Sequence, residues 1–178
     1  MDQNIKLMGN EVYLRPITSD DTDLIVKWRN QENVRKFFFY RGEFTKEGHE
    51  KWLEERVKAG NVVQFIVCMK EDDRPVGSTF LRDIDMSHKK AEFGFFLGEE
   101  DVRGRGIGKD IVDVTVEYAF KIMKLHRVYA KAFESNKPSV GSFLKNGFVQ
   151  EGIFKDSVYT DGEYHDVVCL AKINPYEN

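Results

Sequence analysis

The chain has little cysteine and no cysteine pattern. Its 178 residues include two cysteines, Cys68 and Cys169, which lie in strand-like runs without a Cys-x-x-Cys spacing. Isolated cysteines in such runs usually behave as small, buried hydrophobic residues. We therefore expect two reduced thiols, and we expect neither a disulfide framework, a cysteine metal site nor a cysteine nucleophile.

Long apolar runs and blocks of one charge are also missing. No stretch approaches the ~18 apolar residues of a membrane helix, and the polar first four residues are unlike a signal peptide. The formal net charge of −3 provides no basic footprint for nucleic acid. These absences predict a cytoplasmic protein without a membrane or nucleic-acid partner. With 41% hydrophobic residues and no repeat or linker, residues 1–178 are expected to form a single domain.

The apolar pattern predicts an α+β chain of about seven strands and about four helices. Strands are expected at 11–15, 62–70, 75–85, 90–97, 127–133, 148–159 and 163–173, and helices near 19–30, 46–58, 107–123 and 138–146. Polar turns between the middle strands indicate an antiparallel meander. Asp161-Gly162, between two alternating runs, predicts a two-residue hairpin.

The most informative motif is Arg-Gly-Arg-Gly-Ile-Gly at residues 103–108, between a predicted strand and a predicted helix. The first amides of a helix lack internal partners, and the helix dipole adds partial positive charge there. Glycines let the backbone approach a ligand closely. Arg103, Arg105 and Lys109 add full positive charges, so this turn is predicted to hold a polyphosphate.

Spacing excludes two better-known phosphate loops. A Walker loop needs Gly-x-x-x-x-Gly-Lys-Ser/Thr, but Arg103 stands at its first glycine and Asp110 follows Gly108-Lys109. The dinucleotide fingerprint Gly-x-Gly-x-x-Gly would begin at Gly104 and would need glycine in place of Lys109. Taken alone, the motif also allows a helix start that binds no ligand.

The spacing Arg-x-x-Gly-x-Gly resembles the acetyl-CoA pyrophosphate signature of the GNAT N-acetyltransferases. A second motif follows about 30 residues later, where Asn136, Ser139 and Gly147-Phe148 have the spacing of the same family. The resemblance covers about residues 10–173. Within the family it points to the subgroup that contains ribosomal-protein N-terminal, spermidine and nucleotide-amino-sugar acetyltransferases.

The resemblance implies a GNAT-like α+β fold, with a mixed, mostly antiparallel sheet that splays open at the acetyl-CoA cleft. It implies an acetyltransferase domain that uses acetyl-CoA as cosubstrate, needs no metal, and acetylates a primary amine by direct attack in a ternary complex. The cofactor-binding residues that it implies are Phe95, Phe96, Leu97, Arg103, Gly104, Arg105, Gly106, Ile107, Gly108, Lys109, Asn136, Ser139 and Phe143.

Glu92 is the candidate catalytic base. An aliphatic ammonium titrates near ~10.4, so the amine must lose a proton before it attacks a thioester. Strand alternation puts Glu92, Gly94 and Phe96 on one face, and a lone acid on such a phenylalanine-rich strand is expected to be desolvated. A salt-bridged structural glutamate is the alternative. By family position, the backbone N–H around Phe96 is the candidate catalytic donor to the thioester carbonyl.

Phe143 departs from the family pattern. Many relatives carry a tyrosine four residues before the Gly-Phe pair, where it protonates the departing sulfur. A thiol titrates near ~8.5, so CoA can leave largely as thiolate, and we assign no general acid. Phe143 is expected to pack against CoA or the core.

Residues after the first helix line the acceptor side in this subgroup. The substrate-binding candidates are Trp28, Arg29, Arg35, Phe38 and Tyr40. Arginines and exposed rings favour a flat or anionic small-molecule acceptor such as a nucleotide-linked amino sugar. A protein N-terminus and a polyamine stay open as acceptors, and so does a CoA-binding module without transferase activity. A homodimer is also possible.

Overall fold

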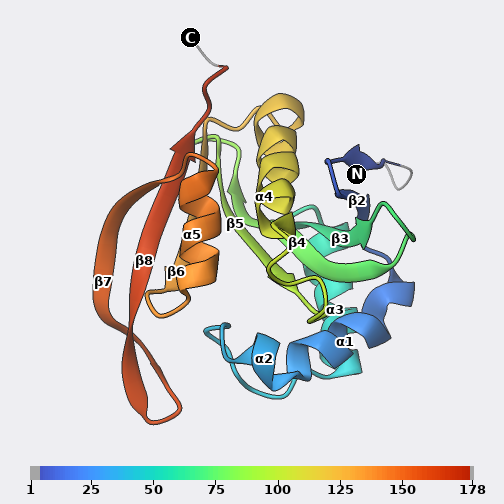
Figure 1. Ribbon diagram of the computed structural model, residues 1–178, viewed down its shortest axis with the longest axis horizontal. Coiled ribbons are helices and arrows are strands. Elements are labelled where there is room, and N and C mark those ends of the chain that lie inside the picture. Colours follow the sequence, from blue (N-terminus) through green and yellow to red (C-terminus); the bar gives the residue numbers. More distant parts are fainter. Residues whose placement is uncertain (1–4, 177–178) are drawn as a thin grey trace.

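The structure is a computed structural model that describes residues 5–176, and it is built on one eight-stranded sheet (Figure 1). The strand order is β1-β2-β3-β4-β5-β6-β8-β7. Neighbouring strands are antiparallel except β5 and β6, which are parallel. The strands are β1 (Leu7–Met8), β2 (Val12–Pro16), β3 (Val63–Met69), β4 (Pro75–Asp85), β5 (Lys90–Leu97), β6 (Arg127–Phe133), β7 (Val149–Thr160) and β8 (Glu163–Ile173).

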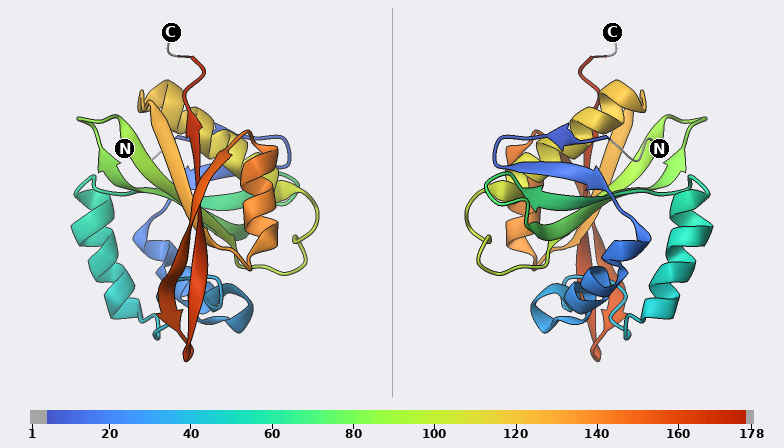
Figure 2. Two further views of the ribbon diagram at one scale, coloured as in Figure 1. Left: turned by 90° about the vertical axis from the view of Figure 1, so that its left-hand side faces the viewer. Right: turned by 90° about the vertical axis from the view of Figure 1, so that its right-hand side faces the viewer.

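Helices cover both faces of the sheet (Figures 1 and 2). They are α1 (Thr22–Asn30), α2 (Glu32–Arg35), α3 (Lys46–Trp52), α4 (Ile107–Glu117) and α5 (Lys137–Lys145). A 3₁₀ turn at Ser19–Asp21 precedes α1, and π-helical segments at Leu53–Lys58 and Tyr118–Ile122 extend α3 and α4. No helix within residues 5–176 has the length and apolar character needed to cross a membrane.

The predicted mixed, mostly antiparallel sheet is confirmed, and the predicted strand limits are within two residues of those observed. The sequence analysis missed β1 and α2. These elements contain two and four residues, too few for an apolar period to be visible. Residues 5–176 therefore form eight strands and five α-helices where about seven and about four were predicted.

Alternation along β5 divides the core into two layers. Phe93 belongs to the layer that packs against α4 and α5, and Phe96 belongs to the layer that packs against α1. The ring of Phe93 contacts that of Phe143, whereas Phe96 contacts Trp28 and Phe38. The predicted division of β5 into two faces is confirmed.

The sheet opens between β5 and β6. These strands pair only from Lys90 to Glu92, although β5 continues to Leu97 and β6 continues to Phe133. Over the same length β6 stays paired with β8, so the two halves of the sheet diverge beyond Glu92. The predicted splay is therefore present, and it leaves one backbone edge of β5 open.

Two smaller predictions concern the hairpin and the cysteines. Asp161 and Gly162 have φ angles of 53° and 86° and form the two-residue turn between β7 and β8, as expected for Asp-Gly. Both cysteines are free thiols. Cys68 is buried as predicted, whereas Cys169 is only half-buried, and burial raises the pKa of both thiols.

Candidate active site

A cavity of about 1150 Å³ lies where β5 and β6 diverge. One side is formed by the start of α4 and by α5, and β5 forms its floor. The opposite side comes from α1, α2, α3 and the segment between α2 and α3. Most of the residues predicted for cofactor and acceptor binding meet at this cavity, although they are up to 114 positions apart, from Arg29 to Phe143.

The loop before α4 presents a row of free amides. The N–H groups of residues 104–108 have no hydrogen-bond acceptor within the described chain, and Lys109 is the first to donate, to Gly106 O at 3.0 Å. Gly104 and Gly106 have φ angles of 79° and 83°, a conformation that side chains other than glycine rarely adopt. This arrangement at a helix N-terminus fits the predicted binding of a pyrophosphate.

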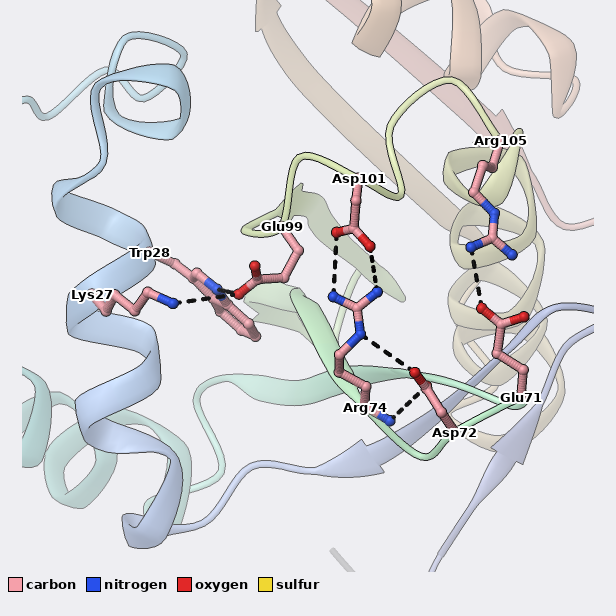
Figure 3. Close-up of polar contacts among 8 residues, drawn as sticks. All are labelled: Lys27, Trp28, Glu71, Asp72, Arg74, Glu99, Asp101 and Arg105. Atoms are coloured by element: carbon pink, nitrogen blue, oxygen red, sulfur yellow. Dashed lines mark hydrogen bonds and ion pairs between the residues drawn. The ribbon is translucent and has the colours of Figure 1, made fainter.

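The charged side chains of this loop have protein partners. Arg103 donates to Leu97 O at 3.0 Å, and Lys109 pairs with Asp113 at 2.6 Å. Arg103 and Lys109 both line the cavity. Arg105 does not line the cavity and pairs with Glu71 at 3.2 Å (Figure 3), so the structure does not group it with the other cofactor-binding candidates.

Trp28 packs against the loop between β5 and α4 and does not line the cavity. Its ring is fully buried, and Nε1 donates to Glu99 Oε1 at 2.7 Å (Figure 3). A Cβ at Gly98 would collide with this ring, so glycine is needed there. The prediction that Trp28 contacts the substrate is therefore wrong. Its large ring lies on the buried face of α1 and packs in the core between α1 and the loop.

Helix α5 forms another part of the wall where the cofactor is predicted to bind. Its N-cap, Asn136, and the buried ring of Phe143 both line the cavity. Asn136 Oδ1 accepts from Ser139 N at 3.3 Å, so the family motif caps α5 as well as lining the cavity. Phe143 is buried, with ring centroids 5.5 Å from Phe93 and 6.0 Å from Phe95. Its predicted packing against the core is confirmed.

The backbone direction of β5 corrects the predicted amide donor. Gly98 N donates to Val76 O at 2.8 Å, and backbone groups alternate in direction along an antiparallel ladder. The amide of Phe96 therefore points toward β4, where the ladder uses it. The amides of Phe95 and Leu97 point toward the open edge, and they replace Phe96 as candidates for polarising a carbonyl.

Glu92 is buried in the cavity wall, where two cations contact its carboxylate. Arg82 is its cross-strand partner on β4 and donates from Nε at 3.1 Å and from Nη2, and Lys131 Nζ on β6 lies 3.5 Å from the second oxygen. The expected burial is confirmed, and the salt bridges named in the alternative are also present, because the strands on either side of β5 each bring a cation. Its role as base stays a prediction.

The acceptor side of the cavity contains a cation without a carboxylate. The Arg29 guanidinium carbon lies 3.2 Å from the ring centroid of Phe38 and 4.8 Å from that of Phe44. Among residues 5–176 no carboxylate pairs with Arg29, and its Nε is buried without a partner. Burial, with repulsion from Arg82, lowers the pKa of Arg29 to about 10, which leaves it protonated at neutral pH.

The remaining acceptor candidates lie in different places. Phe38 and Tyr40 line the cavity, and Tyr40 is exposed at its edge. Arg35 pairs with Glu32 at 3.2 Å and does not line the cavity. The structure therefore brings Arg29, Phe38 and Tyr40 together and leaves Arg35 outside.

Sequence reasoning missed several residues of the cavity floor. Gln64 on β3, Phe80 on β4 and Gly94 on β5 form one cross-strand row, and Arg82 and Lys131 flank Glu92 next to it. Only the strand register brings these residues together, so no spacing in the sequence could have identified them. Within residues 5–176, no group of three or more His, Cys, Asp or Glu side chains could hold a metal ion.

Known proteins that are similar to this chain belong to the family that the glycine motif at residues 103–108 resembles. Residues 11–149 match the family described as acetyltransferase (GNAT) domain. The probable N-acetyltransferase YjcK of Bacillus subtilis is 31% identical over 177 residues, which are 95% of this chain and 97% of YjcK. The structure of a ribosomal-protein-S5-alanine acetyltransferase from Vibrio fischeri has a TM-score of 0.84 and 26% identity, covering 98% of this chain and 100% of that one.

A third relative shares the fold. The spermidine N-acetyltransferase of Vibrio cholerae, in complex with CoA and spermine, has a TM-score of 0.86 at 22% identity, over 92% of this chain and 96% of that one. The chain described here belongs to the GNAT acetyltransferase family. It is an N-acetyltransferase with acetyl-CoA as cosubstrate, and the free amides of residues 104–108 fit the pyrophosphate of that molecule.

Proposed function

We propose that this chain acetylates a primary amine whose molecule also carries an anionic group, and that Arg29 binds that group. The observation that carries this proposal is a largely buried guanidinium on the acceptor side of the cavity, without a carboxylate partner in the described chain. Arginine suits carboxylates and phosphates because its planar fork can donate two parallel hydrogen bonds. A nucleotide-linked amino sugar, which the sequence favours, belongs to this class.

The charge of the acceptor-side wall supports the same class. Its cations are Arg29, Lys36, Arg82 and Lys131, and its acids are Glu43 and Glu92. The carboxylate of Glu92 is already paired with two of these cations. A polyamine would bring several positive charges to a wall that is already positive, so the wall supports an acceptor unlike spermidine.

In the proposed reaction, acetyl-CoA supplies the thioester. The amides of residues 104–108 hold its pyrophosphate, and the amide of Phe95 or Leu97 donates to the carbonyl oxygen. Glu92 accepts a proton from the amine, directly or through water, as the amine nitrogen attacks the carbonyl carbon. The carbon–sulfur bond then breaks and CoA departs as thiolate, since Phe143 cannot donate a proton.

An amine panel tests this function. Thiol release from acetyl-CoA is measured with a UDP-linked amino sugar, a peptide with an acidic residue behind its free N-terminus, and spermidine. We expect the anionic amines to be turned over faster than spermidine. Faster turnover of spermidine would contradict the anionic acceptor, and thiol release with none of the amines would favour a CoA-binding module.

Arg29→Lys tests the residue that carries the proposal. Because lysine cannot make the bidentate contact, we expect the KM for the best anionic amine to rise about tenfold, with little change in kcat, as for lost uniform binding. Arg35→Lys is the matched control, since Arg35 pairs with Glu32 outside the cavity. Equal KM values for Arg29→Lys and the wild type would contradict the assigned role. The cytoplasmic location and the possible homodimer stay predictions.

A further inference from the structure

Part of the acceptor-side wall has no regular secondary structure. Residues 36–44, here called the acceptor segment, connect α2 to α3, and most of them line the cavity. Asn30 fixes the far end, because its Nδ2 donates to Phe44 O at 2.8 Å and its Oδ1 accepts from Phe44 N at 2.9 Å. The middle of the segment must be positioned by other side chains.

Arg41 makes three polar contacts at the middle of the acceptor segment. Its Nη2 donates to Lys36 O at 2.7 Å, and its Nε donates to Phe38 O at 3.4 Å. Its Nη1 donates to the carboxylate of Asp161, at the tip of the β7–β8 hairpin. Only 16% of the Arg41 side chain is exposed, which shields the ion pair from water on the arginine side.

The hairpin gives Arg41 a firm anchor. The tip of the hairpin and the acceptor segment lie at the same end of the molecule, away from the C-terminus (Figures 1 and 2). β8 pairs with β6 along the whole of β6. A second contact joins the acceptor segment to β6, the strand that pairs with β8, because the ring centroids of Phe39 and Phe133 are 4.9 Å apart and the Arg41 guanidinium lies 5.3 Å from the Phe133 centroid.

The contact with Phe38 connects Arg41 to the acceptor site. The ring of Phe38 lies under the Arg29 guanidinium at 3.2 Å and meets the ring of Phe96 with centroids 5.5 Å apart. A shift of the segment at Arg41 would therefore move the surface on which Arg29 rests.

We propose that Arg41 is a positioning residue for the acceptor, which works by tying the acceptor segment to Asp161 on the β7–β8 hairpin. Arg41 does not touch the reacting groups; it acts through Phe38 and Arg29. The inference rests on the proposed assignment of this side of the cavity to the acceptor.

Amide hydrogen exchange of the acceptor segment tests the tie without any acceptor. Asp161→Asn removes the charge and keeps the turn, because asparagine tolerates the positive φ of this position. We expect exchange in residues 36–44 to become about two- to fivefold faster, the range of a partly exposed ion pair. Arg41→Gln, which also loses two backbone contacts, should give a larger increase.

The kinetic test uses the panel amine that the wild type turns over fastest. Both variants should raise the KM for this amine and leave acetyl-CoA affinity unchanged. The double variant Arg41→Gln/Asp161→Asn should match Arg41→Gln alone, because the second change has no remaining partner to remove. Multiplied effects in the double variant would overturn the proposed pairing.

Arg127→Gln is the matched control. It removes another arginine–carboxylate pair, between Arg127 on β6 and Glu151 on β7, that does not touch the acceptor segment. We expect wild-type exchange in residues 36–44 and a wild-type KM. Unchanged exchange in both Asp161→Asn and Arg41→Gln would overturn the proposal.

The proposed function and this inference fail in different ways. If Arg29→Lys keeps the wild-type KM while the exchange and KM of the Arg41 and Asp161 variants change as expected, the anion contact is refuted and the positioning role stands. If Arg29→Lys behaves as expected and the acceptor segment does not respond to Asp161→Asn or to Arg41→Gln, only the positioning role is refuted.

Discussion

At the scale of single residues, Glu92 has the position expected of a catalytic base and the ion pairs expected of a structural residue. It lines the cavity, and Arg82 and Lys131 neutralise its charge. The same two ion pairs would also suit a glutamate that only joins β4, β5 and β6. Its two possible roles can be separated by pH.

Glu92→Gln is expected to lower kcat at pH 7 by about 10²–10⁴-fold if Glu92 is the base. A higher pH should rescue part of the loss, because more of the acceptor is then present as free amine. Steady-state kinetics between pH 7 and 9.5 measure both effects. A wild-type kcat with an unchanged pH profile would make Glu92 structural.

A second residue, His49, is expected to make the stability of the folded state depend on pH. Its side chain is 1% exposed on the cavity wall, with Nδ1 3.1 Å from Thr22 Oγ1 and Nε2 without a partner among the described residues. Burial lowers the pKa of His49 from 6.5 to about 4. Between these values the unfolded chain binds more protons than the folded chain, so stability falls as the pH falls.

Urea unfolding at pH 7 and pH 5 measures this effect. From His49 alone, the wild type should lose about 2 kcal/mol between the two pH values. His49→Gln should be less sensitive to pH by that amount. An equal loss of stability in His49→Gln and the wild type would refute the assignment.

At the scale of elements, a single carboxylate docks α4 onto the start of β2. Asp110 accepts from Asn10 N at 2.9 Å, from Glu11 N at 2.9 Å and from Val12 N at 3.1 Å. A Cβ at Gly9 would lie 2.6 Å from Asp110 Oδ2, so glycine there permits the approach. The helix that follows the free amides of residues 104–108 is thereby fixed to the first strands.

Asp110→Ala is expected to destabilise the chain by about 2–4 kcal/mol, since three backbone amides, of which that of Val12 is buried, lose a charged acceptor. Urea unfolding provides the measurement. Asp113→Ala is the control on the same helix, because its pair with Lys109 is exposed and should change stability little. Equal stabilities of the two variants would show that the amides of residues 10–12 find other partners.

At the scale of the whole molecule, the opening of the sheet between β5 and β6 is expected to make the stability of the fold depend on the cosubstrate. Within residues 5–176, the ladder between β5 and β6 runs only from Lys90 to Glu92, and the cavity lies between the two diverging halves. A ligand that binds only the folded state adds stability according to its concentration relative to its Kd.

CoA at about 100 times its Kd should therefore add about 2.7 kcal/mol, which for a chain of this size raises Tm by about 5–10 °C. Thermal melting with and without CoA measures the shift. Gly106→Val should lose most of it at the same CoA concentration, because valine cannot keep the positive φ of the loop. A full shift in the folded Gly106→Val variant would refute the amide cradle.

The sequence by itself determined most of the elements and the conformation of the glycine-rich loop before α4. Strand and helix periods, the Asp161-Gly162 turn and the glycine motif at residues 103–108 are local patterns, because each depends on residues within one or two turns or strands of one another. The conformations that they demand hold in any tertiary context that keeps the element, so these predictions matched the structure closely.

Only the tertiary structure decided the acceptor side and the environment of Glu92. The partners of Glu92 come from strands 10 positions before and 39 positions after it, and their meeting depends on register. Register also turned the Phe96 amide toward β4, and packing moved Trp28 into the core. These outcomes depend on contacts between residues far apart in the chain, which are set by how whole elements bury their faces and not by any spacing within one of them.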